Sequence, residues 1–237
     1  MNKKLLIIAN NDGLPGVKKD VNNVIRYFKS ITGGFWTNDE IVLFEDPSVG
    51  EVCNNLQSLV NEKLDYLVTY FSGHGDWKRS TNLYLNPNEE FISESDLDGI
   101  ADRQLSIFDC CRGVEEGTSL GDLIEFSSRM QNYDEYYRIR DAFNNRILQA
   151  RGGTHTKLYS CSIGEYSIET ESGGLYTTNL LTSARNHAPG EIDPIILQNT
   201  IKESVNFLNP NQTPDYWCPK LRQSERVVFG IQYQINS

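Results

Sequence analysis

Two stretches of the sequence decide the fold, and each joins an apolar run to a short turn. Residues 65–76 read DYLVTYFSGHGD, and residues 104–113 read QLSIFDCCRG. Both runs are rich in β-branched, aromatic and other apolar side chains, which is typical of a strand buried on both faces. The glycines that follow indicate turns. We therefore predict strands at Asp65–Phe71 and Gln104–Asp109, each leading into a polar turn.

The rest of the chain alternates strand and helix signals. Further strands are predicted at Lys4–Ala9, Glu40–Glu45, Leu83–Leu85, Phe91–Ile92, Lys157–Cys161 and Arg226–Ile231. Apolar residues at helical spacing, together with capping residues, predict helices over 17–31, 48–60, 136–147, 176–186 and 193–208. Strands that alternate with helices indicate an α/β fold. Its sheet is expected to be mainly parallel, with about six strands, and covered by helices on both faces.

Sheets of this kind place their functional sites at the carboxyl ends of the strands, where this chain carries His74 and Cys111. If the two strands are neighbours, an imidazole lies beside a thiol. A cysteine nucleophile reacts as the thiolate and needs a base, and imidazole suits that task because its pKa lies near neutrality. The main-chain N–H groups of Gly75 and Cys111 are candidates for an oxyanion hole.

Each of these residue types also has a structural interpretation. A single histidine is usually a surface or hydrogen-bonded polar residue, which we expect of His155. A buried cysteine is most often a small apolar residue, which fits Cys53 on its helix and Cys161 in its strand. From the residues alone, a structural and a catalytic role are both open for His74 and Cys111.

The composition narrows the class of protein. The 237 residues carry 32 acidic and 22 basic side chains, so the formal net charge is −10. Nucleic-acid and anionic-membrane partners are disfavoured, because both are bound largely through Lys and Arg. We expect a cytoplasmic protein with free thiols, because the five cysteines are an odd number and no apolar run is long enough for a signal peptide or a membrane span. The sequence contains no C-x-x-C or H-x-x-H pair, so a zinc site is not expected.

The two turns resemble the active-site signatures of the caspase/metacaspase superfamily. SGHGD at 72–76 resembles the histidine motif, and DCCRG at 109–113 resembles the cysteine motif, which reads QACRG in caspases. Metacaspases carry Asp two residues before the nucleophile, as this chain does. The resemblance extends to LPGVKKD at 14–20 and to the small-subunit segments at 159–162 and 173–177. Val17 and Lys19 depart from it, since metacaspases carry Cys and Asn there.

The resemblance implies a caspase-like three-layer α/β/α sandwich and assigns roles to residues. It makes Cys111, rather than Cys110, the nucleophile and His74 its base. Three positions match those that line the S1 pocket of metacaspases, which holds the Arg or Lys side chain (P1) before the cleaved bond: Asp20, Ser72 and Asp109. Carboxylates in a recessed pocket favour a cationic side chain. Solvated carboxylates are the alternative interpretation of both aspartates.

We therefore expect a single caspase-like peptidase domain over residues 1–237. It would comprise a large-subunit-like part at 1–113, a linker or insertion at 114–153 and a small-subunit-like part at 154–237. The expected activity is that of a cysteine endopeptidase that cleaves proteins after Arg or Lys. The alternative is a caspase-like pseudoprotease that acts as a binding or sensor module. The Cys-x5-Arg phosphatase motif and the P-loop motif are absent.

A regulated activity is expected, because a free protease of this specificity would damage its cell. Stand-alone bacterial relatives act as effectors in anti-phage defence, some switched on by signalling nucleotides, and the resemblance implies an activator of that kind. No cofactor is expected. Six acidic loop residues could hold calcium, although solvated loops explain them more simply: Glu89, Glu90, Asp96, Asp98, Glu115 and Glu116.

Overall fold

A six-stranded sheet forms the centre of the described part of the chain. The computed structural model describes residues 1–113 and 133–234. The strand order is β12-β8-β7-β3-β1-β2. Five strands run parallel, and β12 at one edge is antiparallel to β8. The strands are β1 (Lys3–Ala9), β2 (Ile41–Glu45), β3 (Tyr66–Ser72), β7 (Arg103–Asp109), β8 (Thr154–Tyr159) and β12 (Asp215–Trp217).

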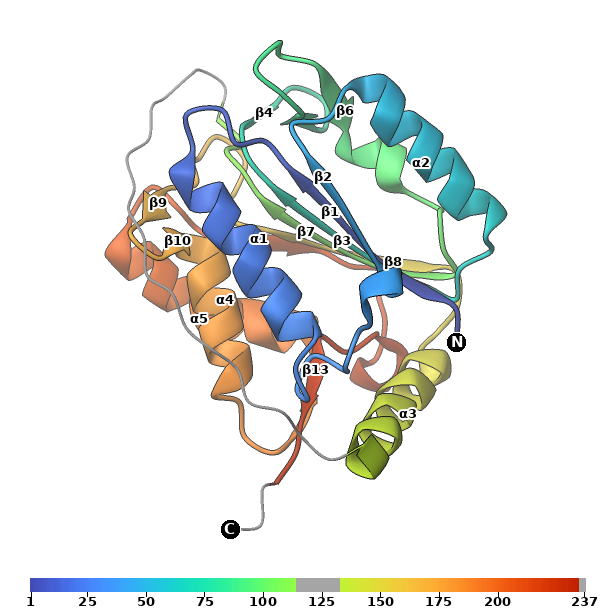
Figure 1. Cartoon of the computed structure of the whole chain (residues 1–237). Helices are drawn as coiled ribbons and strands as arrows, with labels where there is room; N and C mark the ends of the chain where they lie inside the picture. The colour runs from blue at the N-terminus through green and yellow to red at the C-terminus, as the bar shows by residue number, and fades with distance from the viewer. Residues whose placement is uncertain (114–132, 235–237) are drawn as a thin grey trace.

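Helices cover both faces of this sheet (Figure 1). On one face lie α1 (Pro15–Phe28), α4 (Leu175–Arg185) and α5 (Pro194–Leu208). On the opposite face lies α2 (Val49–Asn61). Figure 1 shows α3 (Tyr133–Gln149) at the end of the sheet where the parallel strands begin. The three-layer α/β/α sandwich with a mainly parallel, six-stranded sheet is therefore confirmed.

Strand β1 shows why the central strands are apolar throughout. Leu5, Ile7 and Ala9 belong to the core beneath α1, α4 and α5. Leu6 and Ile8 belong to the second core beneath α2. All five side chains are fully buried. Because successive side chains of a strand point to opposite faces, a strand covered on both faces has no position left for a solvated residue.

Smaller elements complete the fold. β4 (Gly75–Trp77), β5 (Thr81–Tyr84) and β6 (Phe91–Ser93) form an antiparallel sheet that begins just after β3. The two short strands expected in this region are thus confirmed. Two further pairs are β9 (Glu169–Thr170) with β10 (Gly173–Gly174), and β11 (Gly190–Ile192) with β13 (Gly230–Gln232). Three 3₁₀ turns are η1 (Asn38–Glu40), η2 (Glu94–Leu97) and η3 (Gln223–Glu225).

The end of the chain differs from the sequence-based expectation. The strand predicted at Arg226–Ile231 is wrong over most of its length, because only β13 is paired there, and it lies outside the central sheet. Val227–Phe229 are apolar because they are buried in the core, not because they form a strand. The sixth strand of the sheet is β12, whose three residues are too short a run to stand out. In the expected linker, α3 occupies 133–149, and residues 114–132 lie outside the described residues.

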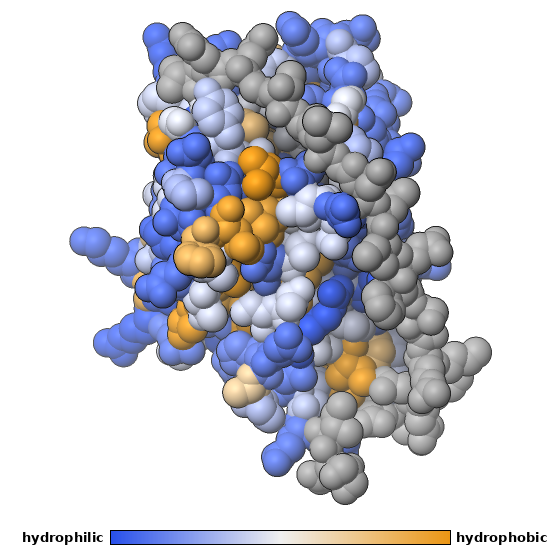
Figure 2. Space-filling view, turned by 90° about the vertical axis from the view of Figure 1, so that its left-hand side faces the viewer, coloured by the Kyte–Doolittle hydropathy of each residue, from blue (hydrophilic) through white to orange (hydrophobic). Residues whose placement is uncertain are grey.

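The surface is largely polar. Figure 2 views the side at the left of Figure 1, where β9 and β10 lie, and shows a small group of apolar side chains among polar ones. Among the exposed apolar residues are Phe207 and Leu208 at the end of α5. In the part of the chain that the structure describes, none of the helices has the length and apolar character needed to cross a membrane.

The start of α5 supplies a test of the fold. Asp193, which is 4% exposed, accepts hydrogen bonds from the N–H groups of Ile195 and Ile196 and pairs with Arg226 at 3.1 Å. We expect Asp193→Ala to lower the free energy of unfolding by roughly 2–3 kcal/mol, because the helix loses its N-cap and Arg226 loses its partner. Urea denaturation measures the change.

Ser48→Ala is the matched control, because Ser48 caps α2 through its hydroxyl at an exposed site. Its expected cost is about 1 kcal/mol. Asp193→Asn should fall between the two, since an amide oxygen can cap the helix but carries no charge. If Asp193→Ala costs no more than Ser48→Ala, the pairing of α5 with the C-terminal segment contributes nothing to stability.

Candidate active site

The paired ends of β3 and β7 bring the two motifs together. Ser72 and Asp109 are partners in the parallel register, so His74 and Cys111 each lie two residues beyond the same point of the sheet. All four residues line one pocket together with Asp20. The pocket volume is about 240 Å³. Sites for drug-sized ligands span roughly 300–1,000 Å³, so this pocket suits a single side chain.

The other residues that line the pocket come from three places in the sequence. They are Leu14, Val17, Gly73, Tyr166, Ser167, Ile168, Glu169 and Gly174. The first two lie at the start of α1, and the last five belong to the segment between β8 and α4. The expected catalytic pair and the three expected S1 residues are therefore adjacent to one another in space, although α1, β3, β7 and the β8–α4 segment are far apart in the chain.

His74 is held in one orientation by a backbone carbonyl. Its Nε2 lies 2.7 Å from the carbonyl oxygen of Asp12. Because a carbonyl can only accept a hydrogen bond, Nε2 carries the proton and Nδ1 is the basic nitrogen. Gly73, with φ of +153°, lets the chain pass closely beside Asn10, where a Cβ would come within 2.7 Å of the Asn10 Cβ. The turn and its glycine thus fix the tautomer and position of the imidazole.

The two adjacent cysteines have different surroundings. Cys111 is half-buried, lines the pocket and donates its thiol hydrogen to the carbonyl of Ser167 at 3.6 Å. Burial raises the pKa of the Cys111 thiol above its ordinary value. Cys110 is 2% exposed and belongs to the core beneath α2. Burial raises the pKa of the Cys110 thiol much further. Of the pair, only Cys111 is open to a ligand in the pocket.

The two expected oxyanion donors lie close together. Tyr84 donates its N–H to the carbonyl of His74, so these two residues form a hydrogen-bonded antiparallel pair. Such pairs alternate with unbonded ones, and the next pair, Gly75 with Leu83, therefore directs the Gly75 N–H away from β5. A Cβ at Gly75 would lie 2.8 Å from the Cys110 sulfur and 2.9 Å from the Cys111 carbonyl oxygen. Only glycine allows this approach of the two turns.

Two carboxylates lie at the base of the pocket without a basic side chain bonded to either within the described residues. Asp20 is 1% exposed and Asp109 is 5% exposed. Asp20 accepts the N–H of Gly174 at 2.9 Å and the hydroxyl of Ser72 at 3.3 Å. Burial raises the pKa of Asp20 well above its ordinary value, and the neighbouring Asp109 adds to the effect. Burial also raises the pKa of Asp109.

Asp109 is held by hydrogen bonds on both of its oxygens. Ser167 donates its hydroxyl to Oδ1 at 2.5 Å. Thr177 donates its hydroxyl and its N–H to Oδ2, at 2.6 and 3.2 Å. Tyr70 lies 2.8 Å from the Thr177 hydroxyl and extends this network into the core. The carboxylate is thus fixed in direction before any ligand arrives.

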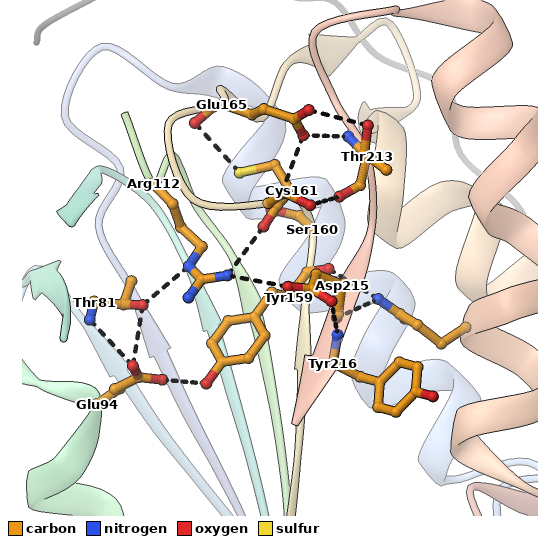
Figure 3. Close-up of polar contacts among 12 residues, drawn as sticks. Thr81, Glu94, Arg112, Tyr159, Ser160, Cys161, Glu165, Thr213, Asp215 and Tyr216 are labelled. Carbon is orange, nitrogen blue, oxygen red and sulfur yellow. Dashed lines mark hydrogen bonds and ion pairs between the residues drawn. The ribbon is translucent and has the colours of Figure 1, made fainter. Parts of the chain in front are cut away.

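The arginine of the cysteine motif is not among the residues that line the pocket, and Figure 3 shows its polar contacts. Arg112 is 5% exposed, and its guanidinium carbon stacks 3.9 Å from the centre of the Tyr159 ring. It also donates to the Thr81 hydroxyl at 3.2 Å and to the Cys161 carbonyl at 3.4 Å. Planar stacking with several donors is a use to which Arg is well suited. Arg112 therefore anchors the turn that carries Cys111 and does not line the pocket.

Several residues of the site were not identified from the sequence. The carbonyl of Asp12 acts through the backbone, so no residue pattern reveals it. Ser167 and Thr177 are common polar residues, and no residue pattern predicts their hydrogen bonds to Asp109. Gly174 had a signal, the glycine pair at 173–174: a Cβ there would collide with the carboxylates of Asp20 and Asp109. This glycine lets the main chain reach both acids.

The structure gives no support for a metal site in the described residues. Within 1–113 and 133–234, no three or more His, Cys, Asp or Glu side chains are grouped to hold a metal ion. Asp98, one of the calcium candidates, pairs with Lys157 at 2.8 Å. Glu115 and Glu116 lie outside the described residues.

The thiol environment predicts a slow alkylation of Cys111 at neutral pH. Because burial raises its pKa, the midpoint of its pH–rate profile with iodoacetamide should lie above the roughly 8.5 of an ordinary cysteine. Peptide mapping after timed alkylation measures it, with the exposed Cys53 as an internal reference. A midpoint below about 7 would contradict the structure and indicate a thiolate paired with a charged imidazole.

Comparison with known proteins agrees with this geometry. None of the curated proteins matches the chain. Among solved structures, caspase-1 from Spodoptera frugiperda superposes with a TM-score of 0.60 at 16% identity, over 98% of this chain and 91% of that one. Protein GSU0716 from Geobacter sulfurreducens superposes with a TM-score of 0.59 at 13% identity, over 98% and 99%. The family model described as the caspase domain matches residues 2–224, and the chain therefore belongs to the caspase domain family, whose members are cysteine peptidases.

Proposed function

We propose that this protein is a cysteine endopeptidase that cleaves after Arg or Lys, with His74 and Cys111 as its catalytic pair. The observation that carries the proposal is the single pocket in which a histidine, an accessible thiol and two buried carboxylates meet. Membership of the caspase domain family supports the reaction class. The basic specificity rests on the carboxylates of Asp20 and Asp109.

The geometry supports a two-step hydrolysis. Nδ1 of His74 takes the thiol proton, and the Cys111 thiolate attacks the carbonyl carbon of the bond to be cleaved. The N–H groups of Gly75 and Cys111 stabilise the oxyanion that forms. The imidazolium then gives its proton to the leaving amine, and a thioester remains on Cys111. Water attacks this thioester with His74 again as the base, which releases the acid product and restores the thiol.

The specificity follows from the cost of burying charge. Two carboxylates about 5% exposed or less are expensive unless a cation or hydrogen bonds compensate them. Their bonds to Gly174, Ser72, Ser167 and Thr177 compensate in part. A guanidinium or ammonium that enters the pocket would supply the missing charge. A P1 aspartate would add a further carboxylate to this acidic pocket and be repelled.

The first prediction separates the two cysteines. Cys111→Ala should abolish peptide hydrolysis, because the nucleophile is lost. His74→Ala should lower kcat/KM by several orders of magnitude, because the thiol loses its base. Cys110→Ala should retain most activity, since Cys110 lies in the core. Hydrolysis of a fluorogenic Arg peptide measures all three.

The opposite pattern, with Cys110 essential and Cys111 dispensable, would move the nucleophile by one residue. Correctly folded wild-type protein that hydrolyses no peptide, with or without added cyclic oligonucleotides and calcium, would instead favour the alternative role, a binding or sensor module.

The second prediction concerns the pocket and pH. Matched peptides with P1 Arg, Lys, Asp or Leu should show kcat/KM highest for Arg and Lys, with Asp lowest. Because the pKa values of Asp20 and Asp109 are raised, the pocket becomes more negative as pH rises. The ratio of kcat/KM for Arg over Leu should therefore increase with pH and fall as acid protonates the pair.

Asp20→Asn provides the matched control for the second prediction, because it keeps the shape but removes one charge. It should lower the Arg and Lys values about tenfold or more and leave the Leu value nearly unchanged, since a charge-assisted hydrogen bond is worth roughly 1.5–3 kcal/mol. A preference for P1 Asp, or an Arg value that Asp20→Asn leaves unchanged, would contradict the assignment of a pocket that selects basic P1 residues.

We further propose that the peptidase is gated in its cell. The resemblance to bacterial anti-phage effectors supports an activator such as a signalling nucleotide, and the raised pKa of Cys111 fits a resting protein of low reactivity. Cleavage of the Arg peptide with and without added cyclic oligonucleotides or calcium would identify the activator. Cytoplasmic location belongs to the same proposal.

A further inference from the structure

Gln212 is a fully buried polar side chain next to the pocket that the proposed mechanism does not use. Its exposed fraction is 0%. Its Nε2 donates to the carbonyl of Ser160 at 3.3 Å and to the hydroxyl of Ser167 at 3.0 Å. Its Oε1 accepts the N–H of Ile168 at 3.2 Å. All its hydrogen-bonding atoms are in use, as burial of an amide requires.

The orientation of this amide is fixed by its two backbone partners. A carbonyl can only accept and a main-chain N–H can only donate, so Nε2 must face Ser160 and Oε1 must face Ile168. Nε2 therefore donates to the Ser167 hydroxyl, which must accept. The only hydrogen of that hydroxyl then remains for Asp109, whose Oδ1 lies at 2.5 Å. Gln212 thus sets the direction of the Ser167–Asp109 hydrogen bond.

Thr213, the residue that follows Gln212 in the chain, is held by Glu165 (Figure 3). The Glu165 carboxylate accepts the N–H of Thr213 at 2.6 Å and its hydroxyl at 3.0 Å. Glu165 also accepts the N–H of Ser162 at 3.1 Å. The segment before β12 and the loop after β8 are therefore joined at two successive residues. Gln212 connects Ser160, the residue directly after β8, to Ser167 and Ile168 in the pocket wall.

We propose that Gln212 is a positioning residue for substrate selection, which acts through Ser167 to hold the Asp109 carboxylate toward the P1 side chain. The inference rests on the proposed function, because it concerns the selectivity of the same pocket. Without the amide, the Ser167 hydroxyl is free to rotate, and Asp109 loses a hydrogen bond that favours its charged form. The consequence is a weaker preference for Arg over an uncharged P1 residue.

The experiment compares Gln212→Met with Gln198→Met. Gln198 is 1% exposed and is bonded in the same way. Its Nε2 donates to the carbonyls of Tyr159 and Asp215, and its Oε1 accepts the hydroxyl of Tyr176. Both variants lose two donors and one acceptor from the interior, and Gln198 makes none of the contacts to Ser167. Loss of stability should be similar, so Gln198→Met controls for it.

The readout is the ratio of kcat/KM for P1 Arg over P1 Leu, from which the fraction of folded enzyme cancels. We expect Gln212→Met to lower this ratio about tenfold at pH 7.5, the equivalent of one hydrogen bond to a charged group, and to shift the acid limb of the Arg profile to higher pH. Gln198→Met should leave the ratio unchanged. An unchanged ratio in Gln212→Met, or an equal fall in both variants, would overturn the inference.

Ser167→Ala provides a second route that does not depend on Gln212→Met folding. It should lower the ratio by a similar factor, and the double variant should lower it no further, because both changes break one connection. Independent, additive effects would contradict the relay through Ser167.

Failure of the proposed function has a different signature, in which wild-type protein cleaves neither peptide or prefers Leu. The inference is then judged by alkylation of Cys111, whose thiol donates to the Ser167 carbonyl. Gln212→Met should raise the alkylation rate about threefold, as expected for loss of a weak hydrogen bond, and Gln198→Met should not. Equal rates in the two variants would overturn the positioning role.

Discussion

The parallel pairing of β3 with β7 in a single register is the constraint on which the site depends. Ser72 pairs with Asp109, and side chains two apart in an extended chain share a face. This places His74 and Cys111 together, with Asp109 beneath them. A slip of one residue would turn every side chain of one strand to the opposite face. The cores on both faces forbid such a slip, because the fully buried residues of β3 and β7 would exchange environments.

The pocket contains two carboxyl groups, Asp20 and Asp109, that are almost fully buried. Among the described residues, main-chain N–H groups and hydroxyls satisfy Asp20 and Asp109. Fixed donors of this kind hold the carboxylates in position before any ligand binds. The pKa values of both acids are raised mainly because burial removes the water that would stabilise their charged forms.

Sequence reasoning succeeded where the signal was local and strong. Continuous apolar runs predicted β1, β3, β7 and β8, and Asp193 with Pro194 predicted the start of α5. The glycine-flanked His74 and the DCCRG turn pointed to one edge of the sheet, which the register of β3 and β7 confirms as a location. Their catalytic roles stay predictions.

Sequence reasoning failed where strand pairing or a main-chain group determines the structure, because neither leaves a local residue pattern. β12 has three residues, and its place beside β8 is set by tertiary contacts. Val227–Phe229 are buried without being a strand, so their hydropathy was misleading. The Asp12 carbonyl has no residue-specific signal, and Gln212 reaches Ser167 across 45 residues of sequence.

Covalent labelling tests the central claim most directly. An acyloxymethyl ketone with Arg at P1 should modify the wild-type protein once, and peptide mapping should place the adduct on Cys111. The matched reagent with Asp at P1 should label far more slowly, because the carboxylates of Asp20 and Asp109 repel it. An adduct on Cys110, or equal labelling by the Arg and Asp reagents, would contradict the account of an acidic pocket that selects a basic P1 residue for the His74–Cys111 pair.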